Sequence, residues 1–145
     1  MWYGEYIHTL DEKDRFILPA KFRQILKTLK KKKFYITRGL DGCLSLYAED
    51  AWEQLKEKLG SLSFTKQQSR HFNRIFFSGA SETMADKQGR MTVPDNLKEF
   101  AQIKREIVII GVVNRIEVWD KNLWTSFYHH NKKRYEEMAE DLFVE

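Results

Sequence analysis

The chain has little of what builds disulfide frameworks, flexible linkers or membrane spans: one cysteine, two prolines and seven glycines among 145 residues. Cys43 has no partner for an intramolecular disulfide, which fits a reducing compartment. The longest apolar stretch, Ile107–Val113, has the length of a strand and is too short to cross a bilayer. The first residues have neither the basic start nor the apolar run of a signal peptide. These absences predict a cytoplasmic protein with one compact, well-filled core and no membrane partner.

The charge is mildly basic and unevenly distributed. The formal net charge is +4 and the sequence pI is about 9.1. A basic cluster comprises Lys21, Arg23, Lys27 and the run 30–33, and an acidic cluster comprises Glu136, Glu137, Glu140, Asp141 and Glu145. This balance permits a nucleic acid partner without requiring one.

A nine-residue segment occurs twice. Asp11, Arg15 and Pro19 return 75 residues later as Asp86, Arg90 and Pro94, and Gly4 and Gly79 share that offset. A fixed period is the mark of a duplicated structural unit. The copied part includes a charged loop that a core would not require, which indicates a doubled surface for a repetitive, charged partner.

Each copy predicts the order strand, strand, helix, strand, strand, helix. In copy one we expect strands over 3–10 and 15–18 forming a hairpin, a helix after Pro19, strands over 34–37 and 44–47, and a helix over 50–59. Copy two repeats this with a hairpin over 79–85 and 90–93, a helix after Pro94, strands over 107–113 and 116–119, and a long helix from Asp120 to about Leu142. Thr65 and Gln68 resemble a capping box that starts a bridging helix.

These elements predict a mostly β, α+β fold with internal duplication. We divide it into a first repeat (1–63), a bridging helix (64–78) and a second repeat (79–145). Neither half has enough strands for a closed sheet, so we expect the halves to intertwine into one small β-barrel with an internal pseudo-twofold.

The repeated loop reverses the chain and offers one arginine at a strand start. Gly89 precedes Arg90 where a turn needs positive φ, and Asp14 takes that place in copy one. Guanidinium groups bind phosphates and guanine edges in a bidentate manner, and Lys13 and Lys87 add charge nearby. The alternative is that Asp11 and Asp86 cap the turns and that each arginine only pairs with a carboxylate. We favour capping for the aspartates and nucleic acid binding for Arg15 and Arg90, and the two roles can coexist.

The doubled Asp-x-x-Gly-Arg-x-x-x-Pro pattern, with a tryptophan-rich segment after each copy, resembles the MraZ family of bacterial transcriptional regulators. The resemblance spans Gly4 to about Trp124. It implies a swapped-hairpin barrel of the AbrB/MazE type, ring-shaped homo-oligomers, and binding of double-stranded DNA at short direct repeats in the promoter of the division and cell-wall gene cluster. The family's DNA-contacting loop corresponds to Lys13, Asp14 and Arg15, and to Gln88, Gly89 and Arg90. This chain departs from the family pattern at Asp14, where glycine is expected, and at Gln88, where lysine is frequent.

Other residue groups favour structural roles. Arg70 and Arg74, and the lysine run 30–33, are more typical of solvated surfaces than of a phosphate track. Trp52 and Trp124 occupy equivalent places and indicate core or subunit contacts, and Cys43 indicates a buried thiol. The four histidines lack metal-ligand spacing, and no catalytic motif is present, so we predict no catalytic residues, no metal, no cofactor and no small-molecule substrate.

We therefore predict a nucleoid-associated, DNA-binding regulator of its own promoter. The alternative is a protein-interaction module, antitoxin-like, that binds an acidic partner. RNA binding is a weaker variant because the aromatic residues lack the pattern of a base-stacking sheet.

Overall fold

The computed structural model describes residues 1–30 and 33–144. Both copies have the element order that the sequence predicts. Copy one contains β1 (Trp2–Thr9), β2 (Arg15–Ile17), α1 (Ala20–Thr28), β3 (Lys33–Arg38), β4 (Leu44–Ala48) and α2 (Glu49–Gly60). Helix α3 (Gln67–Ser78) leads to β5 (Ser81–Met84), β6 (Arg90–Thr92), α4 (Asp95–Phe100), β7 (Glu106–Val113), β8 (Ile116–Asp120), α5 (Lys121–Lys132) and α6 (Tyr135–Phe143).

The strands form two antiparallel sheets whose pairing interleaves the copies. The larger sheet has six strands in the order β1-β7-β8-β4-β3-β5, and β2 pairs with β6 in a separate ribbon. Strand β1 of copy one therefore lies on β7 of copy two, and β5 of copy two lies on β3 of copy one. Replacing each strand of the larger sheet by its equivalent in the other copy gives the same strand order, read from the opposite edge. A pseudo-twofold requires this symmetry.

Two sequence-based expectations about the strands are wrong. The sheet is not a closed barrel, because β1 and β5 end its two edges without pairing to each other. The strands that flank each charged loop do not form a hairpin ladder either, since β1 pairs with β7 and β2 with β6. Both flanking strands obtain their partners from the other copy. The swapped-hairpin assignment and the boundaries 1–63, 64–78 and 79–145 remain predictions.

Residues from both copies fill one core. Phe16 of β2 and Met91 of β6 lie opposite each other, and both are buried. They join Phe34, Leu46 and Ile109 from the larger sheet in the same cluster. Because the larger sheet, the β2–β6 ribbon and helices α1 and α4 all contribute to this shared core, neither copy has an apolar interior of its own.

Two expectations about helices are also corrected. The capping box at Thr65 is not formed: α3 begins at Gln67, and the Thr65 hydroxyl lies 2.7 Å from that of Ser63. The expected long C-terminal helix is divided into α5 and α6 at residues 133–134. The Asn131 side chain donates to the Phe127 carbonyl, 2.9 Å away, and such side-chain bonds compete with the helical ladder.

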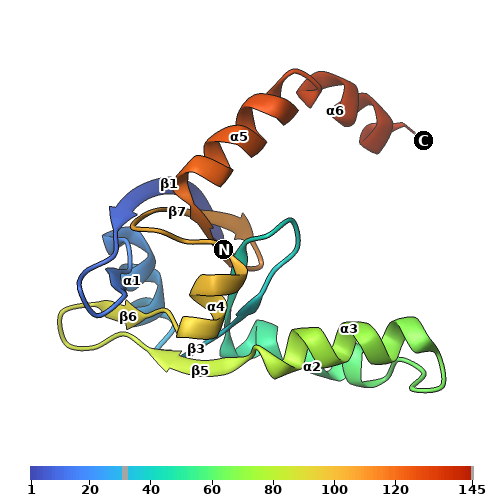
Figure 1. The fold of residues 1–145 in the computed structure, drawn as a ribbon, viewed down its shortest axis with the longest axis horizontal. Helices are drawn as coiled ribbons and strands as arrows, with labels where there is room; N and C mark the ends of the chain where they lie inside the picture. The colour runs from blue at the N-terminus through green and yellow to red at the C-terminus, as the bar shows by residue number, and fades with distance from the viewer. Residues whose placement is uncertain (31–32, 145) are drawn as a thin grey trace.

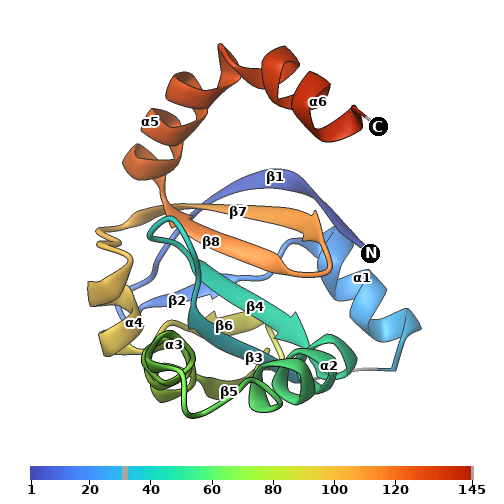
Figure 2. The same cartoon turned by 90° about the vertical axis from the view of Figure 1, so that its right-hand side faces the viewer.

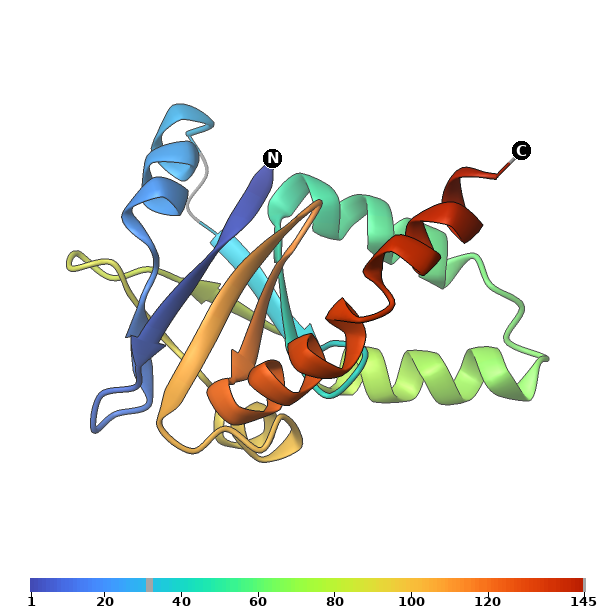
Figure 3. The same cartoon turned by 90° about the horizontal axis from the view of Figure 1, so that it is seen from above.

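The helices lie at different ends of the molecule. Helices α2 and α3 form an antiparallel pair at one end, whereas α5 and α6 form an arm that leaves the sheet on the other side (Figures 1 and 2). Both charged loops, which join β1 to β2 and β5 to β6, project from the side opposite the α2–α3 pair (Figures 1 and 3). One side of the molecule thus presents the two repeated loops together.

Candidate nucleic-acid interface

Each loop is a tight turn held by the side chain of its aspartate. In copy one, Asp11 Oδ1 accepts from the backbone N–H of Lys13 and of Arg15, both at 2.9 Å. In copy two, Asp86 Oδ1 accepts from Gln88 and Arg90 at the same 2.9 Å. The predicted capping role of the aspartates is confirmed. An aspartate at the start of a turn commonly accepts hydrogen bonds from backbone N–H groups a few residues later.

The residue before each arginine has the positive φ that the sequence predicts. Asp14 has φ 57° and Gly89 has φ 80°. Glycine reaches this region without steric cost, and aspartate is one of the few other residues that tolerate it. The two loops therefore keep one backbone shape despite the Asp14 substitution.

The second carboxylate oxygen of each aspartate holds the following arginine. Asp11 Oδ2 lies 2.8 Å from Arg15 Nε, and Asp86 Oδ2 lies 2.7 Å from Arg90 Nε. The arginine side chains remain 23% and 31% exposed, so they are not locked inside the protein. The Nη1 and Nη2 groups form the other end of the guanidinium and carry most of its N–H donors. The carboxylate thus fixes the direction of each arginine, which coexists with a binding role for its outer end.

The same contacts keep both aspartates ionised. Partial desolvation raises the pKa of Asp11. Hydrogen bonds from the backbone and side chain of Arg15 and from the backbone of Lys13 have a larger opposite effect, so the pKa of Asp11 is lowered below its usual value. The backbone N–H of Arg90 is the largest influence on Asp86 and, with the Arg90 side chain, lowers its pKa. Each Asp–Arg unit is therefore a charged pair at neutral pH.

The β2–β6 ribbon brings the two arginines to one face. Arg15 lies opposite Thr92, and Arg90 lies opposite Ile17. Side chains alternate across a strand, so these four point to one side while Phe16 and Met91 point to the core. Residues diagonal to each other in such a ribbon lie roughly 7–8 Å apart at their Cα atoms. Sequence reasoning predicted both arginines but not this common face.

The remaining predicted loop residues have distinct surroundings. Lys13 and Lys87 are exposed. The Gln88 side chain accepts from Arg90 Nη2 at 3.1 Å, so it positions that arginine in place of the lysine that the family pattern favours. The structure thus brings the predicted residues of each copy together in a single turn.

Two cations that sequence reasoning did not assign to the loops lie beside them. Lys98 Nζ of α4 lies 2.9 Å from Asp14 Oδ1, which joins copy two to copy one. Arg23 of α1 lies over Gly89 of the other loop. It is so close that a Cβ atom added to this glycine would lie 2.8 Å from Arg23 Cδ. Lys98 and Arg23 differ by 75 positions, the repeat offset, and that arithmetic could have identified the pair.

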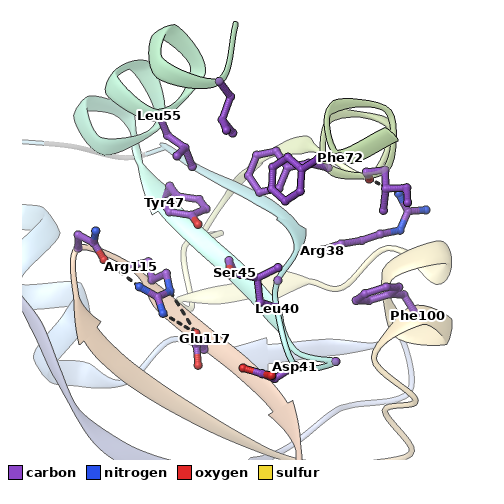
Figure 4. Close-up of a pocket in the computed structure, with 16 residues that line it drawn as sticks. Arg38, Leu40, Asp41, Ser45, Tyr47, Leu55, Phe72, Phe100, Arg115 and Glu117 are labelled. Carbon is purple, nitrogen blue, oxygen red and sulfur yellow. Dashed lines mark hydrogen bonds and ion pairs between the residues drawn. The ribbon is translucent and has the colours of Figure 1, made fainter. Parts of the chain in front are cut away.

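A second surface is an apolar groove between the α2–α3 pair and the turn after β3. It has a volume of about 660 Å³ and is lined by Leu55, Phe72, Ile75 and Phe100 among others. Figure 4 shows Arg38 and Phe100 on one side of this groove and the ion pair of Arg115 with Glu117 on another. Arg38 Nη1 donates to the Ile75 carbonyl at 2.6 Å, which ties β3 to α3.

The two equivalent tryptophans differ in how well they are covered. Trp52 of α2 is buried and stacks between Tyr35 and Phe76, with ring centroids 5.0 and 5.8 Å away. Trp124 of α5 contacts Trp119 and Phe127 but is only half-buried. Phe76 of α3 covers one face of Trp52, whereas Trp124 contacts the rings of Trp119 and of residues in its own helix.

Cys43 matches its predicted surroundings, whereas part of the lysine run does not. Cys43 is buried as predicted, and desolvation raises the pKa of its thiol far above the ordinary value. Lys33 begins β3 and pairs with Glu82 at 2.8 Å, which corrects the expectation of a solvated lysine loop for that residue. Lys31 and Lys32 of the same run lie outside the described residues. Among residues 1–30 and 33–144, no cluster of three or more His, Cys, Asp or Glu could hold a metal ion, and no helix is long and apolar enough to span a bilayer.

A comparison with protein families agrees with the duplicated loop. The sequence model described as "MraZ protein, putative antitoxin-like" matches the chain twice, over residues 1–75 and 76–144. The two matches cover nearly all of the chain, and each contains one copy of the Asp–Arg–Pro loop. This chain belongs to the MraZ family, whose members are of the regulator type.

Proposed function

We propose that the protein is a transcriptional regulator that binds double-stranded DNA through the outward face of the β2–β6 ribbon and its two loops. The carrying observation is that Arg15 and Arg90 lie on one face of this ribbon, each oriented by a carboxylate. Lys13, Asp14, Lys87, Gln88 and Gly89 complete the contact surface.

The geometry suits a duplex for two reasons. Each Asp–Arg pair fixes the guanidinium before binding, so less side-chain entropy is lost when it meets a phosphate or a guanine edge. The pseudo-twofold presents two such groups with related orientations, and base pairs offer repeating acceptors along the groove. The short direct repeats in the protein's own promoter, which the family resemblance implies, are the target that we infer.

Footprinting of the region upstream of the protein's own gene tests this function. We expect protection at short, regularly spaced repeats, with affinity that falls as salt is raised because phosphate contacts release counterions. Uniform weak protection of upstream DNA and of a random-sequence control would contradict a sequence-specific regulator.

We also propose that copies assemble into a ring. Helix α6 has an apolar stripe of Tyr135, Met138, Ala139, Leu142 and Phe143 and an acidic opposite face, and Leu142 and Phe143 are 81% and 84% exposed. The apolar groove beside α2–α3 (Figure 4) lies apart from α6, which is at the end of the arm on another side of the molecule (Figure 1). An arm and a groove on different surfaces make a head-to-tail contact, and such contacts close into rings when the rotation allows. A ring would multiply weak DNA contacts by avidity.

The mass of the assembly in solution tests the role of the arm. The Leu142→Ser/Phe143→Ser variant should give a smaller particle in light scattering after size exclusion. The matched control, Leu62→Ser/Phe64→Ser, removes two exposed apolar side chains in the α2–α3 connection and should leave the mass unchanged. An unchanged assembly in the arm variant would contradict this proposal without affecting DNA binding by the loops.

The alternative is an antitoxin-like module, a role that the family description mentions. In that case the loops would bind an acidic polypeptide, and the interaction would survive nuclease treatment. The footprint separates the two, because a protein-binding module has no preference for its own upstream DNA.

A further inference from the structure

We propose that the two loops are electrically unequal: Arg23 adds a phosphate-binding cation to the second loop, whereas Asp14 withdraws the equivalent cation, Lys98, from the first. This inference rests on the proposed DNA-binding function. It assigns Arg23 to the interface as a residue that touches DNA and Lys98 as one that does not.

The pseudo-twofold places both cations next to the loop of the opposite copy. The Leu18 N–H donates to the Gly89 carbonyl, and the Val93 N–H donates to the Asp14 carbonyl, each at 2.9 Å. These bonds fix the start of α1 against the second loop and the start of α4 against the first. Arg23 and Lys98, on the first turns of α1 and α4, therefore occupy equivalent positions.

The first loop has its cation neutralised. Lys98 Nζ and Asp14 Oδ1 are 2.9 Å apart, and their side chains are 31% and 29% exposed. A lysine that already has a carboxylate partner must break that pair, or share it, to contact a phosphate. It therefore releases little counterion on binding, and the pair adds no net charge to the first loop.

The second loop has the opposite arrangement because Gly89 has no side chain. A Cβ at position 89 would lie 2.8 Å from Arg23 Cδ and 2.9 Å from Arg23 Nη1, so the arginine extends across bare backbone. Arg23 is exposed, and within the described residues no carboxylate pairs with it. Arg23 thus stands beside Arg90 and Lys87 with its charge available.

The sequence differences at two loop positions, Asp14 against Gly89 and Glu12 against Lys87, consequently give different net charges to two loops of the same shape. Loop two presents Arg90, Lys87 and Arg23. Loop one presents Arg15 and Lys13 beside the exposed acid Glu12 and a neutral pair. In a DNA complex, loop two carries more of the salt-dependent affinity.

Removing the acid tests the inference directly. Asn tolerates positive φ, so Asp14→Asn keeps the turn and releases Lys98. With a labelled duplex from the region upstream of the protein's own gene, we expect tighter binding at 50 mM salt. The plot of log affinity against log salt should steepen by about 0.9, the value for one added phosphate contact. The Asp14→Asn/Lys98→Ala variant should show neither the tighter binding nor the steeper plot.

The reciprocal change tests Arg23. Arg23→Ala should make the same plot shallower by about 0.9, so that its affinity relative to the unmodified protein changes about 3-fold between 50 and 200 mM salt. The control Lys58→Ala removes one exposed cation from α2 and should leave the slope unchanged. Equal slopes for Arg23→Ala and Lys58→Ala would overturn the role of Arg23, and an unaltered slope in Asp14→Asn would overturn the role of the pair.

Failure of this inference is distinguishable from failure of the proposed function. If Arg15→Ala/Arg90→Ala abolishes binding while Asp14→Asn and Arg23→Ala match the unmodified protein, the interface stands and the inequality is wrong. Elution from immobilised heparin, a polyanion, tests the charge difference between the loops even if the upstream duplex is not bound. Asp14→Asn should elute at higher salt and Arg23→Ala at lower salt, and coincident elution of all three proteins would contradict the inference.

Discussion

Arg15 and Arg90 lie diagonally across the β2–β6 ribbon on its outward face, each held at Nε by an aspartate four residues earlier. Copy one supplies β2 of this ribbon, and copy two supplies β6. The arrangement therefore requires both copies to be folded, and the pair of arginines is a property of the whole chain.

The first prediction concerns the aspartates that orient the arginines. Asp11→Ala/Asp86→Ala removes the acceptors of both arginine Nε groups and of the turn amides. Freeing each arginine costs about 0.5–1.5 kcal/mol in binding, so Kd for upstream DNA should rise about 2- to 13-fold per loop. Anisotropy titration measures this, and circular dichroism checks that the fold is retained. A Kd equal to that of the unmodified protein would show that preorientation does not matter.

The second prediction concerns acid. The folded-state pKa values of Asp11 and Asp86 are lowered, so their contribution to stability is present above the usual carboxyl pKa near 3.8 and is lost as pH falls through the lower folded values. We expect the free energy of unfolding, measured by chemical denaturation, to fall between pH 5 and pH 3. This fall should be smaller in Asp11→Asn/Asp86→Asn than in the unmodified protein. Identical losses would mean that these carboxylates do not stabilise the fold.

The third prediction concerns the shared core. Phe16 of β2 is buried against residues of both copies, so Phe16→Ala should lower the free energy of unfolding by about 3–5 kcal/mol. Because the copies interleave, unfolding should remain one transition by tryptophan fluorescence and by circular dichroism. Two separated transitions, one per copy, would contradict a common core.

The fourth prediction concerns Cys43. Its side chain is buried, and desolvation raises its pKa, so the thiolate needed for reaction is scarce in the folded protein. A thiol reagent should modify it only at the rate of unfolding, and denaturant should accelerate the reaction. Rapid modification of the native protein at neutral pH would contradict this description of the site.

The local features were predictable from sequence because short-range rules determine them. Asp11 and Asp86 cap turns of their own loops, and positive φ at Gly89 follows from its place before a strand. The element order followed from apolar spacing and from the repeat. These signals lie within a few residues of one another, where propensity and turn chemistry dominate.

The long-range features were not predictable for an equally physical reason. Strands of three residues, such as Arg15–Ile17, do not specify which strand they pair with, so the expected hairpin was replaced by pairing between copies. The contact of Lys98 with Asp14 depends on that pairing. The break in the C-terminal helix at residues 133–134 is marked by neither glycine nor proline, so apolar spacing does not reveal it.

The most direct measurement of the central claim is the affinity of Arg15→Ala/Arg90→Ala for the duplex upstream of the protein's own gene, with assembly mass checked in parallel. The matched variant Lys58→Ala/Arg74→Ala removes the same charge from α2 and α3, away from the loops. We predict that the loop variant loses specific binding, reaching the level of a random-sequence duplex, while the matched variant and the assembly mass are unchanged. Specific binding that persists in the loop variant would contradict the assignment of the β2–β6 face as the DNA-binding surface.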